Sequence, residues 1–352
     1  MLKSINLEFR KEFSPLHHDL SAITYSPKDY LWVGSDETTT IERLSLDEGK
    51  FRQHKSFKLN DFLNLKEGKN QEIDIEGLAY DNYYLWIVGS YSCKRKNPSV
   101  DRSHEENIIR LNTIVIENNR YLLAKIPLVE GELYKKCPHP NNPKITLQAS
   151  QLKTSNNKNI LLQAIKNDPI FKPFMKGNIP SKDNGLDIEG IAVKENKVFL
   201  GLRGPVLRGW AIILELEIMA SKKNKLKFKK CSKDNTIYKK HFVKLEGLGI
   251  RDLCIDKEGI LILAGPTMDL DGPVKLFYLK NGCNLDENAL SWKPRFLKDI
   301  PFGMGNHHAE GITIIENNMN QTYILVVYDS PSDETVLTEC SGVVADIFNI
   351  SI

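Results

Sequence analysis

A repeated two-strand unit constrains the fold of this chain more than any other feature of its sequence. Each copy opens with an apolar run of strand length, passes through a short polar turn and continues into a second apolar run. The runs are rich in β-branched and aromatic residues and are bounded by Gly, Asn and Asp, which is typical of β-hairpins. The five opening runs are Asp19–Tyr25, Asp74–Tyr80, Asp187–Val193, Gly249–Ile255 and His308–Ile314.

The spacing of this repeat predicts a β-propeller. The third position of the opening runs falls at residues 21, 76, 189, 251 and 310, so the intervals are 55, 113, 62 and 59 residues. Four-stranded propeller blades recur at about 40–50 residues, slightly less than the short intervals here. We therefore expect an all-β chain that forms one propeller domain over residues 1–352, with five blades preferred and six as the alternative.

Further apolar runs supply the outer strands of each expected blade. Third strands are predicted at Thr40–Leu46, Ile108–Ile116, Trp210–Ile218, Val274–Leu279 and Val343–Ile350. Fourth strands are predicted at Phe51–Leu59, Tyr121–Pro127, His241–Leu245 and Pro294–Asp299. The last unit has no fourth strand of its own, and Ile5–Phe9 is expected to supply it and close the ring.

The interval of 113 residues leaves room for a sixth unit or for an insertion. Apolar residues in Leu161–Ile165 and Ile170–Met175 have helical spacing, and Asp168 followed by Pro169 is typical of a helix start. We therefore predict a mostly helical insertion near residues 131–185, between blades two and three and over one mouth of the ring.

Composition excludes several classes of partner. The 48 Lys and Arg residues nearly balance 45 Asp and Glu residues, which gives no case for nucleic acid binding. Apolar runs such as Ile212–Leu216 are far shorter than a membrane span, and the N-terminus lacks the pattern of a signal peptide. The six cysteines include no C-x-x-C pair, so we expect reduced thiols in a cytoplasmic protein.

Paired acids at the start of the first strands predict a site at one mouth of the channel. Antiparallel pairing sets the start of each first strand beside the end of the second strand, and positions i and i+2 share a face. Hard oxygen ligands suit Ca²⁺, Mg²⁺ or Mn²⁺, and we expect no organic cofactor. The predicted metal ligands are Glu76, Asp187, Glu189 and Glu310.

Basic residues near the same mouth complete the predicted site. Arg203 and Arg208 are expected to neutralise a small anionic substrate, and His308 is expected to act as acid or base. The alternative is that these acids join neighbouring blades through Arg–carboxylate bridges, and that the histidine makes only hydrogen bonds at the rim. The chain has no H-E-x-x-H, P-loop or G-x-S-x-G motif.

Two motifs carry a family resemblance. Lys182–Ala192 followed by Gly201–Gly209 resembles the hallmark of the bacterial domain-of-unknown-function family numbered 3616, and the resemblance runs over nearly the whole chain. More loosely, the Asp-x-Glu-Gly strand is similar to propellers of the phytase-like and SdiA-regulated kinds. That resemblance implies a site on the ring, since some of those relatives bind calcium or act as esterases. Ser21 and Arg251 replace the glutamate in two units, so the expected site is lopsided.

Two functions therefore follow from the sequence. The first is metal-assisted hydrolysis of a phosphoester, ester or lactone at the channel mouth. The second is a non-catalytic propeller scaffold whose top face binds a protein partner or a sugar. Fold alone does not choose between them.

Overall fold

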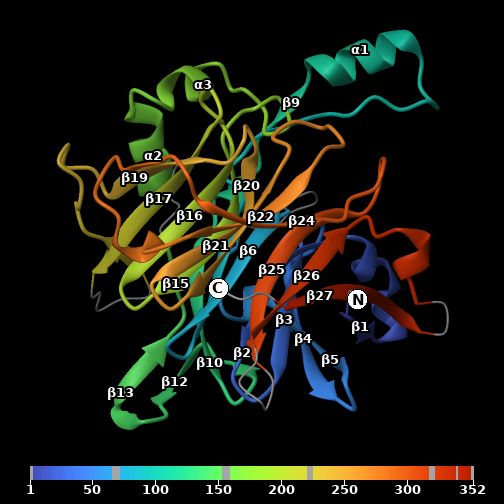
Figure 1. The fold of residues 1–352 in the computed structure, drawn as a ribbon, viewed down its shortest axis with the longest axis vertical. Coiled ribbons are helices and arrows are strands. Elements are labelled where there is room, and N and C mark those ends of the chain that lie inside the picture. Colours follow the sequence, from blue (N-terminus) through green and yellow to red (C-terminus); the bar gives the residue numbers. More distant parts are fainter. Residues whose placement is uncertain are drawn as a thin grey trace.

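The computed structural model describes residues 3–65, 72–152, 159–219, 225–316, 322–337 and 340–349. Its backbone is dominated by β-strands that fan out around a common centre, with few helices (Figure 1). Most strands pair antiparallel with the next strand in the chain. This arrangement is the all-β, propeller-like fold that the repeat predicted.

Within the described residues, the principal strands form five antiparallel meanders of four strands each. The first contains β2 (Leu20–Ser26), β3 (Tyr30–Ser35), β4 (Thr40–Asp47) and β5 (Lys50–Lys58). The second contains β6 (Ile75–Asp81), β7 (Tyr84–Gly89), β10 (Leu123–Val129) and β14 (Ser150–Leu152). The third contains β15 (Asp187–Lys194), β16 (Lys197–Gly204), β17 (Trp210–Met219) and β19 (Tyr238–Lys244).

The last two meanders follow the same order. The fourth contains β20 (Gly249–Asp256), β21 (Gly259–Gly265), β22 (Val274–Leu279) and β24 (Arg295–Ile300). The fifth contains β25 (His308–Glu316), β26 (Thr322–Asp329), β27 (Ser341–Asn349) and β1 (Lys3–Phe9).

Short elements decorate this frame. The short strands are β8 (Lys94–Arg95), β9 (Ile114–Val115), β11 (Glu132–Leu133), β12 (Lys136–His139), β13 (Asn142–Gln148), β18 (Lys225–Phe228) and β23 (Leu290–Ser291). The α-helices are α1 (His104–Asn112), α2 (Ile160–Asn167) and α3 (Lys172–Lys176). Five 3-10 turns are described: η1 (Lys11–His18), η2 (Leu59–Asp61), η3 (Asn118–Tyr121), η4 (Gly282–Asn284) and η5 (Asp333–Thr335).

The N-terminal strand completes the last meander, as predicted. β1 pairs antiparallel with β27 from Lys3 opposite Ile347 to Phe9 opposite Ser341. Leu7 is fully buried in this strand. Pairing the start of the chain with its end covers the strand edge that would otherwise be open to solvent.

The first strands of the five meanders contact one another in a closed cyclic order, and hydrogen bonds link three of the neighbouring pairs. The backbone N–H of Tyr25 in β2 donates to Oγ1 of Thr313 in β25 at 3.1 Å. The hydroxyl of Ser21 in β2 donates to the carbonyl oxygen of Ile75 in β6 at 2.5 Å. The backbone N–H of Ile312 in β25 donates to Oδ2 of Asp252 in β20 at 2.8 Å. Because these bonds cross from one sheet to the next, they fix the relative position of neighbouring meanders.

Glycines allow the backbones of neighbouring first strands to approach closely. A Cβ atom added to any of the three would overlap an atom of the neighbouring first strand, at 2.8 Å for Gly77 from Ile191, 2.9 Å for Gly190 from Leu253 and 2.8 Å for Gly311 from Ile23. Only glycine lets strands approach this closely at these positions. These glycines directly follow Glu76, Glu189 and Glu310 in the sequence.

A cavity of about 160 Å³ lies where the first strands converge. Its lining comes from all five of them, β2, β6, β15, β20 and β25, and includes Ile23, Leu78, Ile191, Leu253 and Ile312. The cavity therefore marks the axis around which the meanders are arranged. Apolar cores fill the spaces between neighbouring sheets, and the buried Trp32 and Trp86 belong to them.

The predicted third strand at Ile108–Ile116 is wrong. Residues His104–Asn112 form helix α1, which projects from the body of the molecule (Figure 1). A capping box starts this helix: Ser103 accepts from the N–H of Glu106, and the Glu106 carboxylate accepts from the N–H of Ser103. The true third strand of this meander is β10, where a fourth strand had been expected, and β14 is the fourth.

The prediction of a mostly helical segment at 131–185 is also wrong in its first half. Residues 132–152 contain strands β11 to β14, and β12 and β13 form a hairpin. Pro140 and Asn141 lie in its turn, a composition that favours a hairpin over a helix. Helices occupy only Ile160–Asn167 and Lys172–Lys176, where the helical spacing was noted. Asn159 caps α2 by accepting from the N–H groups of Leu161 and Leu162.

No helix in the described part of the chain is long and apolar enough to cross a membrane.

Replacing Gly190 by alanine tests the close approach of the first strands. The new methyl group would lie 2.9 Å from the backbone nitrogen of Leu253, and neither backbone can move without disturbing its sheet. We expect Gly190→Ala to lower the free energy of unfolding by about 1–3 kcal/mol, measured by urea denaturation. The control is Gly177→Ala, where the nearest atom is on the flexible side chain of Ile179. Equal stability of the two variants would contradict close packing at the axis.

Candidate acidic site at the channel mouth

Each first strand carries a β-bulge at the same position of the repeat. The pairing register shifts once between the residues that flank this position, with one further shift earlier in β15. A bulge redirects its side chain and is frequent beside functional sites. The bulged residues are Ser21, Glu76, Glu189, Arg251 and Glu310.

Arg203 binds two acids of its own meander. Its Nη1 lies 2.5 Å from Oε1 of Glu189, and its Nε lies 3.2 Å from Oδ2 of Asp187. All three side chains are buried. The antiparallel pairing of β15 with β16 predicted this contact, because it sets the start of one strand beside the end of the other.

Arg251 joins three meanders. Its Nη1 lies 2.5 Å from Oε1 of Glu310 in β25 and 3.4 Å from Oε2 of Glu189 in β15. Arg251 itself belongs to β20. The arginine that replaces glutamate in the fourth unit is therefore a counter-charge for acids on both sides.

Arg120 is a third buried guanidinium, and sequence reasoning missed it. Its Nη1 lies 2.5 Å from Oδ2 of Asp74 and its Nε lies 3.0 Å from Oε2 of Glu117. The same Nη1 donates to the hydroxyl of Ser92 at 3.0 Å. Arg120 lies in η3, between strands, where no repeated motif marks it. Only the fold brings it beside the start of β6.

Glu76 lies among several acids and has no basic partner in the described residues. No basic side chain among the described residues lies within ion-pair distance of its carboxyl. Burial raises the pKa of Glu76 well above its ordinary value, and the carboxylates of Asp74, Glu189, Asp187 and Glu310 raise it further. A positive charge placed here would relieve this repulsion.

We define the acid ring as the seven carboxyl groups that interact electrostatically around the mouth. They are Asp36, Asp74, Glu76, Asp187, Glu189, Glu310 and Asp329. Three arginines, Arg120, Arg203 and Arg251, are the guanidiniums paired with members of this ring in the described residues. The ring therefore carries more acids than the protein neutralises.

Raised pKa values reduce the excess negative charge of the acid ring, because a carboxyl group with a raised pKa keeps its proton to higher pH. Burial raises the pKa of Asp187 to about 8, against the opposing effect of Arg203. Burial also raises the pKa of Asp36 to about 8, and Glu310, Asp74 and Asp329 add to the shift. Within such a cluster the protein must bind protons or a cation to reduce the repulsion.

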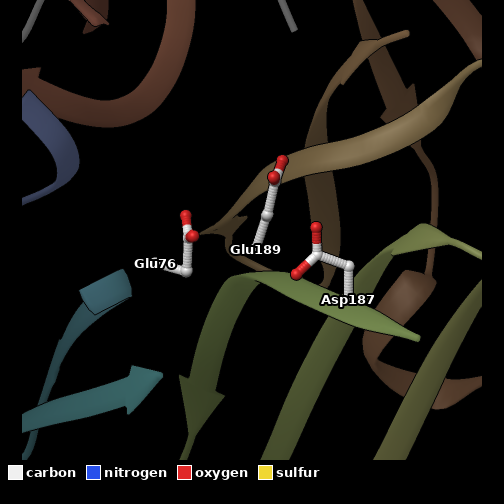
Figure 2. A group of neighbouring side chains, drawn as sticks. All are labelled: Glu76, Asp187 and Glu189. Atoms are coloured by element: carbon white, nitrogen blue, oxygen red, sulfur yellow. The ribbon is translucent and has the colours of Figure 1, made fainter. Parts of the chain in front are cut away.

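Three members of the ring have the arrangement of a metal-binding group. One carboxylate oxygen from each of Glu76, Asp187 and Glu189 lies within 4.8 Å of the other two. Their carboxyl groups lie around a common space (Figure 2). Oε2 of Glu189 is buried and accepts no hydrogen bond in the described structure, although Nη1 of Arg251 lies 3.4 Å away. A buried carboxylate oxygen in this position is suited to a cation ligand.

The other predicted site residues lie at different distances from this group. Glu310 belongs to the acid ring but its Oε1 is held by Arg251. His308 lies at the rim, with Nε2 3.3 Å from Oδ1 of Asp271 and Nδ1 4.0 Å from Oδ2 of Asp329. Arg208 is exposed, and its guanidinium forms no ion pair with a described residue. The fold thus brings Arg203 into the ring and leaves Arg208 at the surface.

Comparison with known proteins gives a family and a distant fold likeness. The family model described as "Protein of unknown function (DUF3616)" matches residues 19–346. No curated protein matches the chain.

Among solved structures, the chain resembles the hydrazine synthase of Kuenenia stuttgartiensis, with 9% identity and a TM-score of 0.32, over 92% of this chain and 58% of that one. It also resembles virginiamycin B lyase from Staphylococcus aureus, with 9% identity and a TM-score of 0.39, over 99% of both chains. A third is the Cps50 (Swd1) β-propeller domain of Myceliophteria thermophila, with 8% identity and a TM-score of 0.35, over 99% of this chain and 100% of that one. Likenesses this distant bear on neither substrate nor reaction.

Removing one guanidinium tests its role in holding the ring together. Arg203→Met leaves Asp187 buried without its counter-charge, and leaves Glu189 with only the 3.4 Å contact to Arg251. We expect a loss of about 3–5 kcal/mol in the free energy of unfolding, measured by chemical denaturation at neutral pH. Arg208→Met is the matched control, because Arg208 is exposed and only five residues away. Comparable losses in the two variants would show that the buried ion pairs are not what stabilises the mouth.

The raised pKa values predict how the stability of the metal-free protein depends on pH. Between the ordinary and the raised pKa, the folded state binds more protons than the unfolded state, so the free energy of unfolding falls as pH rises. The fall should extend from the ordinary acid range up to about pH 8, the raised pKa of Asp187. Glu76→Gln should flatten this dependence, since it removes a carboxyl whose pKa is strongly raised.

Urea denaturation in the presence of EDTA at several pH values measures this slope. Glu105→Gln, on the exposed face of α1, is the control and should keep the slope of the original protein. Parallel slopes for Glu76→Gln and the original protein would mean that Glu76 titrates normally.

Proposed function

Because this chain belongs to the family described as protein of unknown function DUF3616, whose description assigns no reaction, we propose its function from the acid ring itself. We propose that the ring binds a divalent cation and that the protein is a metal-assisted hydrolase of a phosphoester, an ester or a lactone. The single observation that carries this proposal is the group of three carboxylates whose oxygens lie within 4.8 Å of one another, in which the buried Oε2 of Glu189 accepts no hydrogen bond.

The proposal includes a five-bladed propeller of one domain, residues 1–352, with the mouth at one end of its axis. The cyclic contacts of β2, β6, β15, β20 and β25 support five blades. Residues 131–185 are then an insertion between blades two and three, which also contributes the outer strand β14 to blade two. A sixth blade would need another first strand at the axis, and the axial cavity is lined by these five.

The proposed ligands follow from the geometry. Glu76, Asp187 and Glu189 supply oxygen atoms at compatible distances, and oxygen ligands suit Mg²⁺, Mn²⁺ or Ca²⁺. Glu310 lies beside this group and is held by Arg251, so it adds negative charge to the site. A bound cation would offset the excess negative charge of the ring, so that its carboxyl groups would not need to keep their protons.

The chemistry of the proposal is water activation. A divalent ion held by Glu76, Asp187 and Glu189 would lower the pKa of a bound water and so supply a nucleophile for an ester or phosphoester at neutral pH. Arg203 fixes the orientation of Asp187 and Glu189 through its two ion pairs. His308 lies at the rim beside Asp271 and Asp329 and is proposed to exchange a proton with the leaving group. Arg208, exposed and five residues beyond Arg203, is proposed to bind the anionic part of a substrate.

Calorimetry on EDTA-treated protein tests the cation site. We expect heat of binding with Mn²⁺, Mg²⁺ or Ca²⁺ at one site, and at least about a tenfold loss of affinity in Glu76→Gln and Glu189→Gln, because each removes one charged ligand. Glu105→Gln is the control and should bind as the original protein does. Metal-dependent turnover of p-nitrophenyl phosphate, p-nitrophenyl acetate or a simple lactone, lost in folded Glu76→Gln, supports the hydrolase.

The second candidate function is a scaffold that binds a protein partner or a sugar at the mouth. The observation in its favour is that Arg251 bridges acids of different meanders, as structural ion pairs between blades would. On this alternative no metal binds, and Glu189→Gln destabilises the protein whether or not metal is added. Absence of metal binding by a folded protein would therefore overturn the hydrolase and leave the scaffold.

A further inference from the structure

A second cavity, apart from the acid ring, lies under the short helices. It has a volume of about 370 Å³, and we call it the helix pocket. Its apolar walls come from α2, α3, η3 and the connecting segments beside them, and they include Tyr91, Tyr121, Leu162, Phe174, Met175 and Leu186. A concave, mostly apolar cavity of this size is typical of a small-molecule site.

The wall of the helix pocket is rigidly built. Nδ2 of Asn159 donates to the hydroxyl of Tyr91 at 3.1 Å and to the carbonyl oxygen of Tyr121 at 2.9 Å. Oδ1 of the same residue accepts from the N–H groups of Leu161 and Leu162. The rings of Tyr91 and Tyr121 meet edge to face with centroids 5.7 Å apart. These contacts set two aromatic rings in place before any ligand binds.

One cation faces the helix pocket without a counter-charge. Lys166, in the last turn of α2, is among the lining residues and is exposed. It forms no ion pair with a carboxylate in the part of the chain that the structure describes. The other polar lining groups are neutral: Cys93, Asn118, Asn159 and Asn178 are uncharged side chains. The charge of the pocket is therefore complementary to a single negative charge.

The helix pocket adjoins the acid ring through η3. Asn118 and Tyr121 of this turn line the pocket, whereas Arg120 between them holds Asp74 of the ring. Leu186 also lines the pocket and directly precedes Asp187. A ligand in the pocket would therefore touch neighbours of two residues that shape the ring.

We propose that the helix pocket binds a small organic anion with an apolar, preferably aromatic, body. The body packs between Tyr91, Tyr121 and Leu162, and the negative group pairs with Lys166. This binding does not depend on a metal at the acid ring, so it stands or falls separately from the proposed hydrolase.

Titration with 1-anilinonaphthalene-8-sulfonate, an aromatic anion whose fluorescence rises in apolar surroundings, tests the proposal. We expect saturable binding at one site, unchanged by EDTA. Lys166→Gln should weaken it by about two- to fivefold, the range of an exposed ion pair. Lys172→Gln on the neighbouring helix α3 is the matched control, since Lys172 is exposed and does not line the pocket.

Filling the cavity gives the stricter test. Leu162→Trp should abolish binding. If this variant does not fold, Met175→Trp replaces it, because Met175 is less buried and its substitution should also abolish binding. Thermal melting shows which variant is folded. Undiminished dye binding by a folded tryptophan variant would overturn the proposal.

Cys93 provides an independent readout because its thiol lines the helix pocket. Saturating dye should slow the alkylation of Cys93 by iodoacetamide several-fold, and peptide mass spectrometry measures the rate. Cys231 lies outside the pocket and should react at an unchanged rate. Equal rates for Cys93 with and without dye would place the bound dye elsewhere and would contradict the proposal.

Discussion

The burial of more carboxyl groups than guanidiniums around one axis is the constraint on which the rest of this structure depends. Arg120, Arg203 and Arg251 each bind two acids or more, yet Glu76 has no cation beside it among the described residues. A buried charge without a partner is costly, so the cluster must take up protons or a cation.

The strand packing that creates this imbalance is itself an outcome of small residues. Gly77, Gly190 and Gly311 let neighbouring first strands approach closely, and the bulge just before each glycine turns an acid toward the mouth. A residue larger than glycine would push neighbouring first strands apart. A strand without a bulge would keep its side chains strictly alternating between the two faces of the sheet. Glycine and bulge together therefore bring charged side chains from separate meanders within a few ångströms of one another.

Much of the site could be predicted from the sequence, because the repeat fixes both strand pairing and phase. Antiparallel pairing alone placed Arg203 beside Glu189 and His308 opposite Asp329. The bulges could not be predicted from alternation, which assumes a regular strand. The pairing of Arg120 with Asp74 was also out of reach, because the two are 46 residues apart and no motif links them. The second meander was misassigned where a capping box outweighed a β-branched run at Ile108–Ile116.

The sequence by itself determined the all-β fold, the five first strands, the closing role of Ile5–Phe9 and the gathering of Glu76, Glu189 and Glu310. These features depend on local periodicity and on repetition, which are written in the chain. Only the tertiary structure decided which acids are paired with arginine, and that Glu76 has no such pair in the described residues. It also decided that a pocket opens beneath α2 and α3. Charge balance and cavities arise from contacts between segments that are far apart in the sequence, and only the packing of the whole chain determines which of those segments meet.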